Sequence, residues 1–508
     1  MGDFSTAEAA IATPHAPTLD ERLLARALSG RHLIDGAFVA SASGATFGVA
    51  NPATGEEIAR GARGNGTDVD AAVESAARAQ KSWARMPARR RGAMVAECGA
   101  TLRAHSEELA RLMALESGKA LRTESRIEAQ NLADILEFFG GLGGELKGES
   151  VPFVPDVLSV TVREPLGVVG AIIPWNVPML LMALKIAPAL VAGNAVVVKS
   201  ASEAPLAVLR ICELMNRILP PGCFNIVSGF GSEVGQALVA HPLVRKLTFT
   251  GSVEVGRIVS RLAAEKLIPV TLELGGKSPM LVFADCDFDR TVAGAITSMR
   301  FTRQGQSCTA ASRIYVERPI FEPFVEAMAA RVDAMVMGDP LDEKTDIGTI
   351  ISEAQFAKVR AYVEEGRATP GAVAHLCGRL PTDPALRKGL FMQPVIFTGL
   401  KNTSRLVQEE IFGPVTVVFP FDDAEAVLAA ANASEFGLAA SVWTNNLRRG
   451  LALAHRLEAG LVQVNQNLVV QANISYGGVK SSGLGKEASL ESMLEHFTHK
   501  KTIMVNYA

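Results

Sequence analysis

The chain has 508 residues, of which 48% are hydrophobic and 20% charged, and its formal net charge is −3. This length predicts two or three domains, and the nearly balanced charge argues against a nucleic-acid partner. The six cysteines are scattered, and no Cys/His group has the spacing of metal ligands. We therefore expect no metal site, no disulfide framework and a cytoplasmic location, and no apolar run reaches the roughly 20 residues of a membrane span.

The N-terminal third of the chain carries mainly helical patterns. Residues 1–18 lack the apolar core of a signal peptide and predict a loose arm. A helix is expected from Thr67, and a longer helical stretch is expected to end near Gly118. The glycine-rich segment 140–148 predicts a boundary, and the alternation over 158–165 predicts a strand outside the main sheet.

From residue 167 onward, short apolar runs alternate with helical stretches. The predicted strands are 167–173, 195–199, 224–227, 246–249 and 269–274. This alternation is typical of βαβ units and predicts a parallel sheet covered by helices on both faces. A second α/β block is expected from Gly276 to about Ser482, and the end of the chain resembles an edge strand.

Several stretches are typical of a phosphate or cofactor site, although each also has an ordinary structural explanation. Gly229 and Gly231 form a glycine turn after a predicted strand, where backbone amides could face an anion. Gly251 and Ser252 lie where a helix starts, which suits a pyrophosphate or a plain serine cap. Lys199 ends a strand and could bind a ribose or a phosphate, or be solvated.

Two residues are candidates for catalysis. Glu273 ends a predicted strand between Leu272 and Leu274, and apolar neighbours raise the pKa of a carboxyl toward that of a general base. A surface glutamate is the alternative. Cys308 lies in RQGQSCTAASR, among small residues that leave room for a substrate. It is either a nucleophile or a small buried hydrophobic residue.

Six stretches in order, IIPWNVP, FTGSVEVG, LELGGKSP, GQSC, EEIFGPV and YGGVKSSG, resemble the aldehyde dehydrogenase family, from about Arg31 to the C-terminus. The resemblance implies an α/β fold with a Rossmann-like cofactor domain, an α/β catalytic domain and a small β extension for oligomerisation. We expect these parts at 19–147 with 166–275, at 276–482, and at 148–165 with 483–508. The extension predicts a homodimer or homotetramer.

The resemblance also implies a covalent route from an aldehyde to a carboxylic acid. Cys308 would attack the carbonyl to give a thiohemiacetal, and Asn176 and the Cys308 amide would hold its oxyanion. After hydride transfer to a nicotinamide, Glu273 would activate the water that hydrolyses the thioester. Lys185 matches a position linked to proton relay near this base.

By the same resemblance the cofactor is NAD, with NADP also possible. The implied cofactor-binding residues are Ile173, Pro174, Trp175, Lys199, Ser202, Gly229, Gly231, Phe249, Gly251, Ser252, Gly256, Leu274, Glu410 and Phe412. NAD-preferring relatives often carry glutamate at the position of Ser202, where a carboxylate repels a ribose 2′-phosphate. Serine there leaves the use of NADP open.

The implied substrate pocket is mostly apolar and predicts a medium-chain aliphatic or aromatic aldehyde, unless its members are ordinary core residues. They are Val177, Leu181, Leu184, Thr302, Val469 and Tyr476. Arg303 replaces a common asparagine, and we expect it to form a surface salt bridge, although it could also bias a channel toward anions. No evident cationic cluster indicates a carboxylated substrate.

Three other functions are alternatives to hydrolytic aldehyde oxidation. A CoA-acylating dehydrogenase usually lacks a glutamate at the position of Glu273. A catalytically silent binding or structural homologue would not need both Cys308 and Glu273. A cysteine hydrolase would need a histidine partner for Cys308, and none is near it in the sequence, although the fold could supply one.

Overall fold

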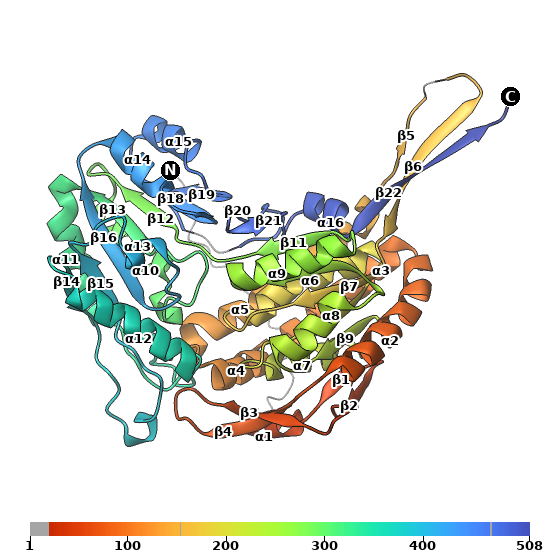
Figure 1. The fold of residues 1–508 in the computed structure, drawn as a ribbon, viewed down its shortest axis with the longest axis horizontal. Helices are drawn as coiled ribbons and strands as arrows, with labels where there is room; N and C mark the ends of the chain where they lie inside the picture. The colour runs from red at the N-terminus through yellow and green to blue at the C-terminus, as the bar shows by residue number, and fades with distance from the viewer. Residues whose placement is uncertain (1–19, 153, 468–469) are drawn as a thin grey trace, which may run out of the picture.

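The computed structural model describes residues 20–152, 154–467 and 470–508. The predicted arm over residues 1–18 and the predicted pocket residue Val469 lie outside the described residues. Two α/β units lie side by side, and a narrow strand extension projects away from them (Figure 1).

The first unit is built on an eight-stranded sheet. Its strands, in spatial order, are β2 (Ala37–Val39), β1 (His32–Ile34), β9 (Phe224–Val227), β8 (Ala195–Lys199), β7 (Val168–Ile172), β10 (Val244–Thr250), β11 (Val270–Glu273) and β21 (Gly483–Leu484). The strands from β9 to β11 in this order are parallel, and β1 and β21 join antiparallel at either side. The predicted βαβ alternation is therefore confirmed.

Helices cover both faces of this sheet because neighbouring residues of a strand point to opposite sides. The covering helices are α2 (Gly66–Arg85), α6 (Pro178–Ala192), α7 (Leu206–Met215), α8 (Gln236–Ala240) and α9 (Val253–Glu265). Val196 and Val198 of β8 share one core with α6 and α7. Ala195 and Val197 share another core with α2, α8 and α9. This alternation explains why β8 is a continuous apolar run.

The N-terminal helices differ from the prediction in two details. Helix α2 begins after Asn65 rather than at Thr67, because Asn65 and Asp68 form a reciprocal capping box. The single predicted helical stretch ending near Gly118 is two helices, α3 (Ala88–Ala104) and α4 (Ser106–Ser117), separated by His105. Acidic residues in the first turn of α4 support this new helix start. Gly118 ends α4 in the left-handed conformation, as glycine commonly does.

The second unit is built on a seven-stranded sheet. Its strands, in spatial order, are β14 (Val373–Leu376), β15 (Val395–Thr398), β16 (Val415–Phe421), β13 (Arg313–Glu317), β12 (Pro279–Val282), β18 (Ala439–Trp443) and β19 (Leu461–Val464). All pairs are parallel except that of β14 with β15. The helices of this unit are α10 (Phe288–Met299), α11 (Phe321–Asp333), α12 (Glu353–Ala368), α13 (Arg405–Gln408), α14 (Ala424–Asn432) and α15 (Leu447–Ala454). The predicted second α/β block is confirmed.

The extension is a three-stranded antiparallel sheet, ordered β22 (Thr498–Asn506), β6 (Val157–Pro165) and β5 (Glu149–Ser150). It projects from the body of the molecule (Figure 1). The predicted strand at the end of the chain is confirmed, and it lies on the edge of this sheet. Within residues 483–508, β21 joins the eight-stranded sheet and α16 (Leu490–His496) contacts α6, so only β22 belongs to the extension.

The remaining described α-helices and β-strands are mostly short, and α5 packs against α6. They are α1 (Glu21–Ala27), β3 (Thr46–Ala50), β4 (Glu57–Ala62), α5 (Arg126–Gly141), β17 (Phe436–Gly437) and β20 (Val479–Lys480). Among the residues described, no helix is both long and apolar enough to cross a lipid bilayer.

Candidate active site

The site lies where parallel strands of the first sheet end against a loop of the second unit. Strands β7, β8, β10 and β11 end next to one another, so the segments that follow them meet at one edge. Ligands of open α/β sheets bind at such carboxyl ends. The second unit contributes Cys308, which follows the short turn Phe301–Arg303 and precedes β13. Two cavities border this meeting point, and Asn176 and Cys308 line both of them.

One cavity, of about 240 Å³, contains half of the predicted cofactor residues. Its lining residues are Pro174, Trp175, Asn176, Thr250, Gly251, Ser252, Leu274, Gly275, Cys308, Gln355, Lys358, Glu410 and Phe412. We call it the cofactor-side cavity. Gln355 and Lys358, which come from α12 of the second unit, were not predicted, because no recognisable motif surrounds them.

Glu410 gives this cavity a carboxylate among apolar and aromatic neighbours. Its Oε1 accepts a hydrogen bond of 2.9 Å from the Gly276 amide, and burial raises the pKa of its carboxyl to about 7. Nearby, the rings of Trp175 and Phe412 meet edge to face with centroids 5.3 Å apart. The cavity thus offers a hydrogen-bond acceptor beside a fixed aromatic pair.

Lys199 and Ser202 lie apart from this cavity. Lys199 is buried, which lowers its pKa to about 8, and the charge of Glu203 acts in the opposite direction. The Ser202 hydroxyl donates to Glu203 Oε2 at 3.0 Å. Ser202 and Glu203 line a third cavity together with Phe230 and Ile351. A carboxylate therefore does lie beside Ser202, although the sequence places it one residue later.

Besides Lys199, five predicted cofactor residues line neither the cofactor-side cavity nor the third one. Ile173 and Phe249 are buried in the cores, and Gly256 lies against the side chain of Leu274. Gly229 and Gly231 lie in the turn after β9, where Gly231 begins a short π-helical segment. Ser252, which does line the cofactor-side cavity, also caps α9, because its Oγ accepts from the Val255 amide.

The second cavity, on the other side of Cys308, is called the aldehyde-side cavity. Its lining residues are Asn176, Val177, Leu180, Leu181, Ser278, Pro279, Arg300, Arg303, Ser307, Cys308, Thr309, Ala311, Ala439, Ala440, Ser441, Leu461, Gln463, Asn467, Val470 and Tyr476. Three predicted pocket residues, Val177, Leu181 and Tyr476, are among them. Leu184 is instead fully buried in the hydrophobic core, and the Thr302 hydroxyl is bound to the carboxylate of Glu124.

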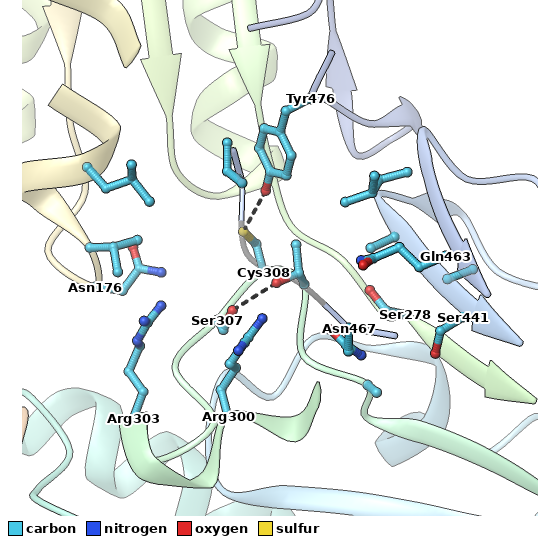
Figure 2. Close-up of a pocket in the computed structure, with 18 of the residues that line it drawn as sticks. Asn176, Ser278, Arg300, Arg303, Ser307, Cys308, Ser441, Gln463, Asn467 and Tyr476 are labelled. Carbon is cyan, nitrogen blue, oxygen red and sulfur yellow. Dashed lines mark hydrogen bonds between the residues drawn. The ribbon is translucent and has the colours of Figure 1, made fainter. Parts of the chain in front are cut away.

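Arg303 forms its predicted salt bridge, but the prediction of a surface location is wrong. Its guanidinium pairs with Glu124, with a distance of 2.7 Å from Nε to Oε2, and its side chain is only 12% exposed. Arg300, which the sequence analysis overlooked, lines the same cavity and is 8% exposed. Both arginine side chains point from one segment toward the region of Cys308 (Figure 2).

Cys308 itself has a protonated thiol at neutral pH. Burial raises the pKa of this thiol to about 11, and the hydrogen bond with Tyr476 opposes that shift. The Sγ atom lies 3.6 Å from the Tyr476 hydroxyl, which approaches it directly (Figure 2). The loop packs so closely on the β11–β12 connection that a Cβ at Gly276 would lie 2.1 Å from the Cys308 carbonyl oxygen. This position therefore requires glycine.

Asn176 is held against the cysteine loop from two sides. Its Nδ2 donates to the carbonyl of Gln306 at 3.1 Å, two residues before Cys308. The backbone carbonyl of Asn176 accepts a hydrogen bond from Lys119 Nζ at 3.0 Å, and Lys119 forms an ion pair with buried Glu128. Lys119 and Glu128 lie on segments far from any recognised motif, so the sequence gives no signal for their role in positioning Asn176.

Glu273 is buried and lines neither of the two cavities. Burial, and to a smaller extent the charge of Glu487, raise its pKa well above the ordinary value of a carboxyl, while Lys185 acts in the opposite direction. The predicted raised pKa is confirmed. Gly477 lies against Glu273, and its φ of +147° and the backbone carbonyl of Gly485, 2.9 Å from where a Cβ would lie, favour glycine there. Lys185 is fully buried and pairs with Glu487 at 2.7 Å.

The described lining of the two cavities contains no histidine, so neither supplies the partner that a cysteine hydrolase needs. The described residues also include no group of three or more His, Cys, Asp or Glu placed to hold a metal ion. The chemistry available around Cys308 is that of a thiol, an amide donor, a phenol and buried charges.

Known proteins resemble this chain over nearly its whole length. The description "Aldehyde dehydrogenase family" applies to residues 38–503. Phenylacetaldehyde dehydrogenase of Pseudomonas fluorescens is 42% identical over 485 residues, covering 94% of this chain and 95% of the relative. A betaine aldehyde dehydrogenase of Cereibacter sphaeroides is 40% identical over 475 residues, covering 93% and 96%.

Solved structures agree. Betaine aldehyde dehydrogenase of Staphylococcus aureus in complex with NAD+ superposes with a TM-score of 0.92 at 35% identity, covering 96% of this chain and 97% of that one. A variant of the aldehyde dehydrogenase from Bacillus cereus also gives 0.92 at 35% identity, covering 98% and 100%. The chain therefore belongs to the aldehyde dehydrogenase family and is an NAD(P)-dependent aldehyde dehydrogenase.

Proposed function

We propose that this enzyme oxidises its aldehyde to the free acid through a covalent intermediate on Cys308. The observation that carries the proposal is the meeting of two cavities at Cys308 and Asn176. A thiol between the two spaces can bond to a carbonyl carbon in one while a cofactor occupies the other. Attack forms the Sγ–C bond and turns the carbonyl oxygen into an oxyanion, giving a thiohemiacetal.

Asn176 and the Cys308 backbone amide are the proposed donors to this oxyanion. The Asn176 amide is fixed by its bond to the Gln306 carbonyl and retains a second N–H. Fixed donors stabilise developing negative charge without reorganisation during the reaction. Lys119 and Glu128 act as positioning residues, since they hold the backbone of Asn176 rather than the substrate.

Glu273 is the proposed general base, and its buried position supports this role. The Cys308 thiol is protonated at neutral pH and must lose its proton to attack, and the later thioester needs an activated water. A carboxyl with a raised pKa suits both transfers. Because Glu273 lines neither cavity, the proposal includes a rotation of its side chain toward Cys308. The buried pair Lys185–Glu487 is the proposed route for the proton beyond Glu273.

The cofactor-side cavity fits a nicotinamide dinucleotide, and we propose NAD. Glu410 can accept from ribose hydroxyls, and Trp175 and Phe412 can hold a flat ring. When bound there, the nicotinamide supplies the hydride acceptor of the oxidation. Lys199 would face the adenosine ribose. The carboxylate of Glu203 beside Ser202 disfavours the 2′-phosphate of NADP, and NAD is the ligand of the Staphylococcus aureus relative.

The proposed substrate has an apolar stem, since Val177, Leu180 and Leu181 form one wall of the aldehyde-side cavity. The two relatives named above differ in the charge of their substrates: phenylacetaldehyde is neutral, and betaine aldehyde is a quaternary cation. Cation sites of that kind are usually aromatic cages. The described lining here has Tyr476 as its single aromatic residue and also includes Arg300, so it is not suited to a quaternary cation.

We further propose a homodimer or homotetramer in the cytoplasm. The extension formed by β22, β6 and β5 exposes apolar side chains, including Leu158, Met504 and Val505. An exposed antiparallel edge of this kind pairs readily across a two-fold axis. All six cysteines are free, which fits a reducing compartment. The domain boundaries expected from the sequence remain part of this proposal, except that within residues 483–508 only β22 belongs to the extension.

Initial rates of reduced-nicotinamide formation test the proposal. They are measured with NAD and NADP across aliphatic, aromatic and carboxylated aldehydes, with and without CoA. We expect oxidation that does not depend on CoA, because Glu273 activates water as the acyl acceptor. Strict dependence on CoA would contradict the hydrolytic route, and the absence of oxidation with every aldehyde would favour a catalytically silent homologue.

A further inference from the structure

The aldehyde-side cavity contains a buried positive charge with no hydrogen-bonded or ion-paired partner. The Arg300 side chain is 8% exposed, and within the described part of the chain its guanidinium makes no hydrogen bond or close ion pair; the charge of Glu124, which is already paired with Arg303, acts on it from beyond ion-pair distance. Burial lowers its pKa to about 10, so it remains charged at neutral pH. A buried charge is costly unless it is paired, which makes this guanidinium an unusual feature of the cavity.

Arg303 is a useful contrast in the same segment. Its guanidinium is neutralised by the carboxylate of Glu124, which is also buried and also accepts from Thr302. One of the two arginines that point into the cavity is therefore paired and the other is not (Figure 2). The net charge that an entering molecule meets comes from Arg300.

Polar side chains extend from Arg300 along one wall of the cavity. Ser278 is 3% exposed, and its hydroxyl has no hydrogen-bond partner among the described residues. Ser307, Ser441 and Asn467 line the same wall (Figure 2). Ser307, Ser441 and Asn467 already hydrogen-bond to other side chains. The unpaired hydroxyl of Ser278 is the group on this wall that a polar ligand would complete. The wall thus offers donors and a positive charge but no carboxylate.

The conformation of Arg300 directs it into the cavity. It is the residue that ends α10, and its φ of +56° is in the left-handed region, which glycine and asparagine usually occupy. A long charged residue at this backbone position has a conformational cost. Such strain is often associated with a ligand-binding role.

We infer that the physiological substrate is an aldehyde carrying a carboxylate, and that Arg300 binds this carboxylate while the aldehyde carbon reaches Cys308. This inference rests on the proposed function and names the substrate class of the same site. The apolar wall would contact the methylene or aryl stem between the two groups. A guanidinium pairs with a carboxylate through two parallel hydrogen bonds, which favours this anion over a hydroxyl or a halide.

The same geometry separates substrates by charge. A carboxylated aldehyde would pair Arg300, whereas a neutral aldehyde would leave it unpaired. An aldehyde with a trimethylammonium group would meet direct repulsion and a single aromatic ring. We therefore expect an order of preference in kcat/KM of anionic, then neutral, then cationic.

Steady-state kinetics with three aldehydes of matched chain length test this order: an ω-oxo carboxylic acid, the corresponding alkanal and the trimethylammonium aldehyde. For the wild-type enzyme we expect kcat/KM to be about 10- to 100-fold higher for the oxo acid than for the alkanal, which is the range of a hydrogen bond between charged groups. Arg300→Gln should reduce this ratio to near one, mainly through a higher KM for the oxo acid.

Two further variants control for charge and backbone. Arg300→Lys keeps the charge and should retain part of the preference for the oxo acid. It has the same left-handed backbone requirement as Arg300→Gln, so a difference between the two reports the charge and not the fold. Arg261→Gln removes a positive charge from the exposed face of α9 and should leave the ratio unchanged.

The outcomes also separate this inference from the proposed function. Oxidation of the alkanal with equal or higher kcat/KM than the oxo acid would overturn the inference and leave the covalent mechanism standing. A preference that survives in Arg300→Gln would also overturn it, because another group would then bind the carboxylate. A lack of oxidation with all three aldehydes would refute the proposed function itself.

Discussion

The two cavities that meet at Cys308 are built in different ways. The cofactor-side cavity depends mainly on turns at the ends of β7, β10 and β11, where the backbone must follow one path. The aldehyde-side cavity is assembled from side chains of α6, β18, β19 and the segment around Arg300. The first kind of site is constrained by the fold, and the second is free to vary with the substrate.

The two cavities also differ in the charge of their lining residues. The carboxylate of Glu410 on the cofactor side can accept from the hydroxyls of a cofactor. Arg300 on the aldehyde side gives that space the opposite sign. If the two cavities act independently, a substitution in the aldehyde-side cavity or at the border between them should leave cofactor binding intact. The substitutions below test that independence in order of decreasing effect.

Cys308→Ala should give the largest effect. It removes the sulfur that bonds to the substrate, so oxidation should fall by at least about 10⁴-fold, as expected for loss of a nucleophile. Cofactor affinity, measured by fluorescence titration with NAD, should change by less than about threefold, since alanine removes only one atom from the lining. Cys286→Ala, which alters a half-buried cysteine outside both cavities, is the control and should retain full activity. Residual oxidation near the wild-type rate in Cys308→Ala would refute the covalent route.

Glu273→Gln should have the second-largest effect. The amide has the same shape but cannot take a proton, and the loss of a general base costs about 10²- to 10⁴-fold. Stopped-flow absorbance should show a burst of reduced cofactor followed by slow turnover, because the substitution slows hydrolysis of the thioester more than the acylation and hydride transfer that precede it.

The pH dependence gives a second test of Glu273. The wild-type carboxyl has a raised pKa and becomes a base only above it, so turnover should increase as the pH rises through that value. Turnover of Glu273→Gln should not show this increase with pH. Turnover of Glu265→Gln, which changes an exposed residue at the end of α9, should still show it. An unchanged profile in Glu273→Gln would place the water-activating group elsewhere.

Much of the fold could be predicted because its signals are local. The strands β8 and β9 have the predicted residues, since each is a short apolar run ending at a polar or turn residue. The split between α3 and α4 was missed, because one apolar periodicity continues across His105. The capping box at Asn65 was also missed, since a cap is defined by side-chain geometry.

The predictability of the site follows the same division. Residues in short stretches that are recognisable in the sequence, such as Trp175, Gly251 and Glu410, line the expected cavity. Leu184 and Thr302 do not, because the direction of a helical or turn side chain depends on packing with distant elements. The burial of Arg303 depends on Glu124, which is 179 residues away, and no local pattern reveals such a partner.

Tyr476→Phe should have the smallest effect and should act on the aldehyde side alone. The phenol lies 3.6 Å from Cys308 Sγ and opposes the rise in thiol pKa, and burial keeps the phenol itself protonated. Removing the hydroxyl should raise the pKa of Cys308 further above about 11, so that less thiolate exists at any lower pH. Alkylation by iodoacetamide should then be about two- to tenfold slower, which corresponds to one hydrogen bond.

The measurement is the alkylation rate as a function of pH, read by mass spectrometry at Cys308. The profile of Tyr476→Phe should shift toward higher pH, with NAD affinity unchanged because Tyr476 does not line the cofactor-side cavity. Tyr315→Phe, which loses a hydroxyl bonded to Asn402 in the second unit, should keep the wild-type profile. Faster alkylation in Tyr476→Phe would mean that the phenol shields the sulfur rather than stabilising its anion, and the role of Tyr476 would then be steric.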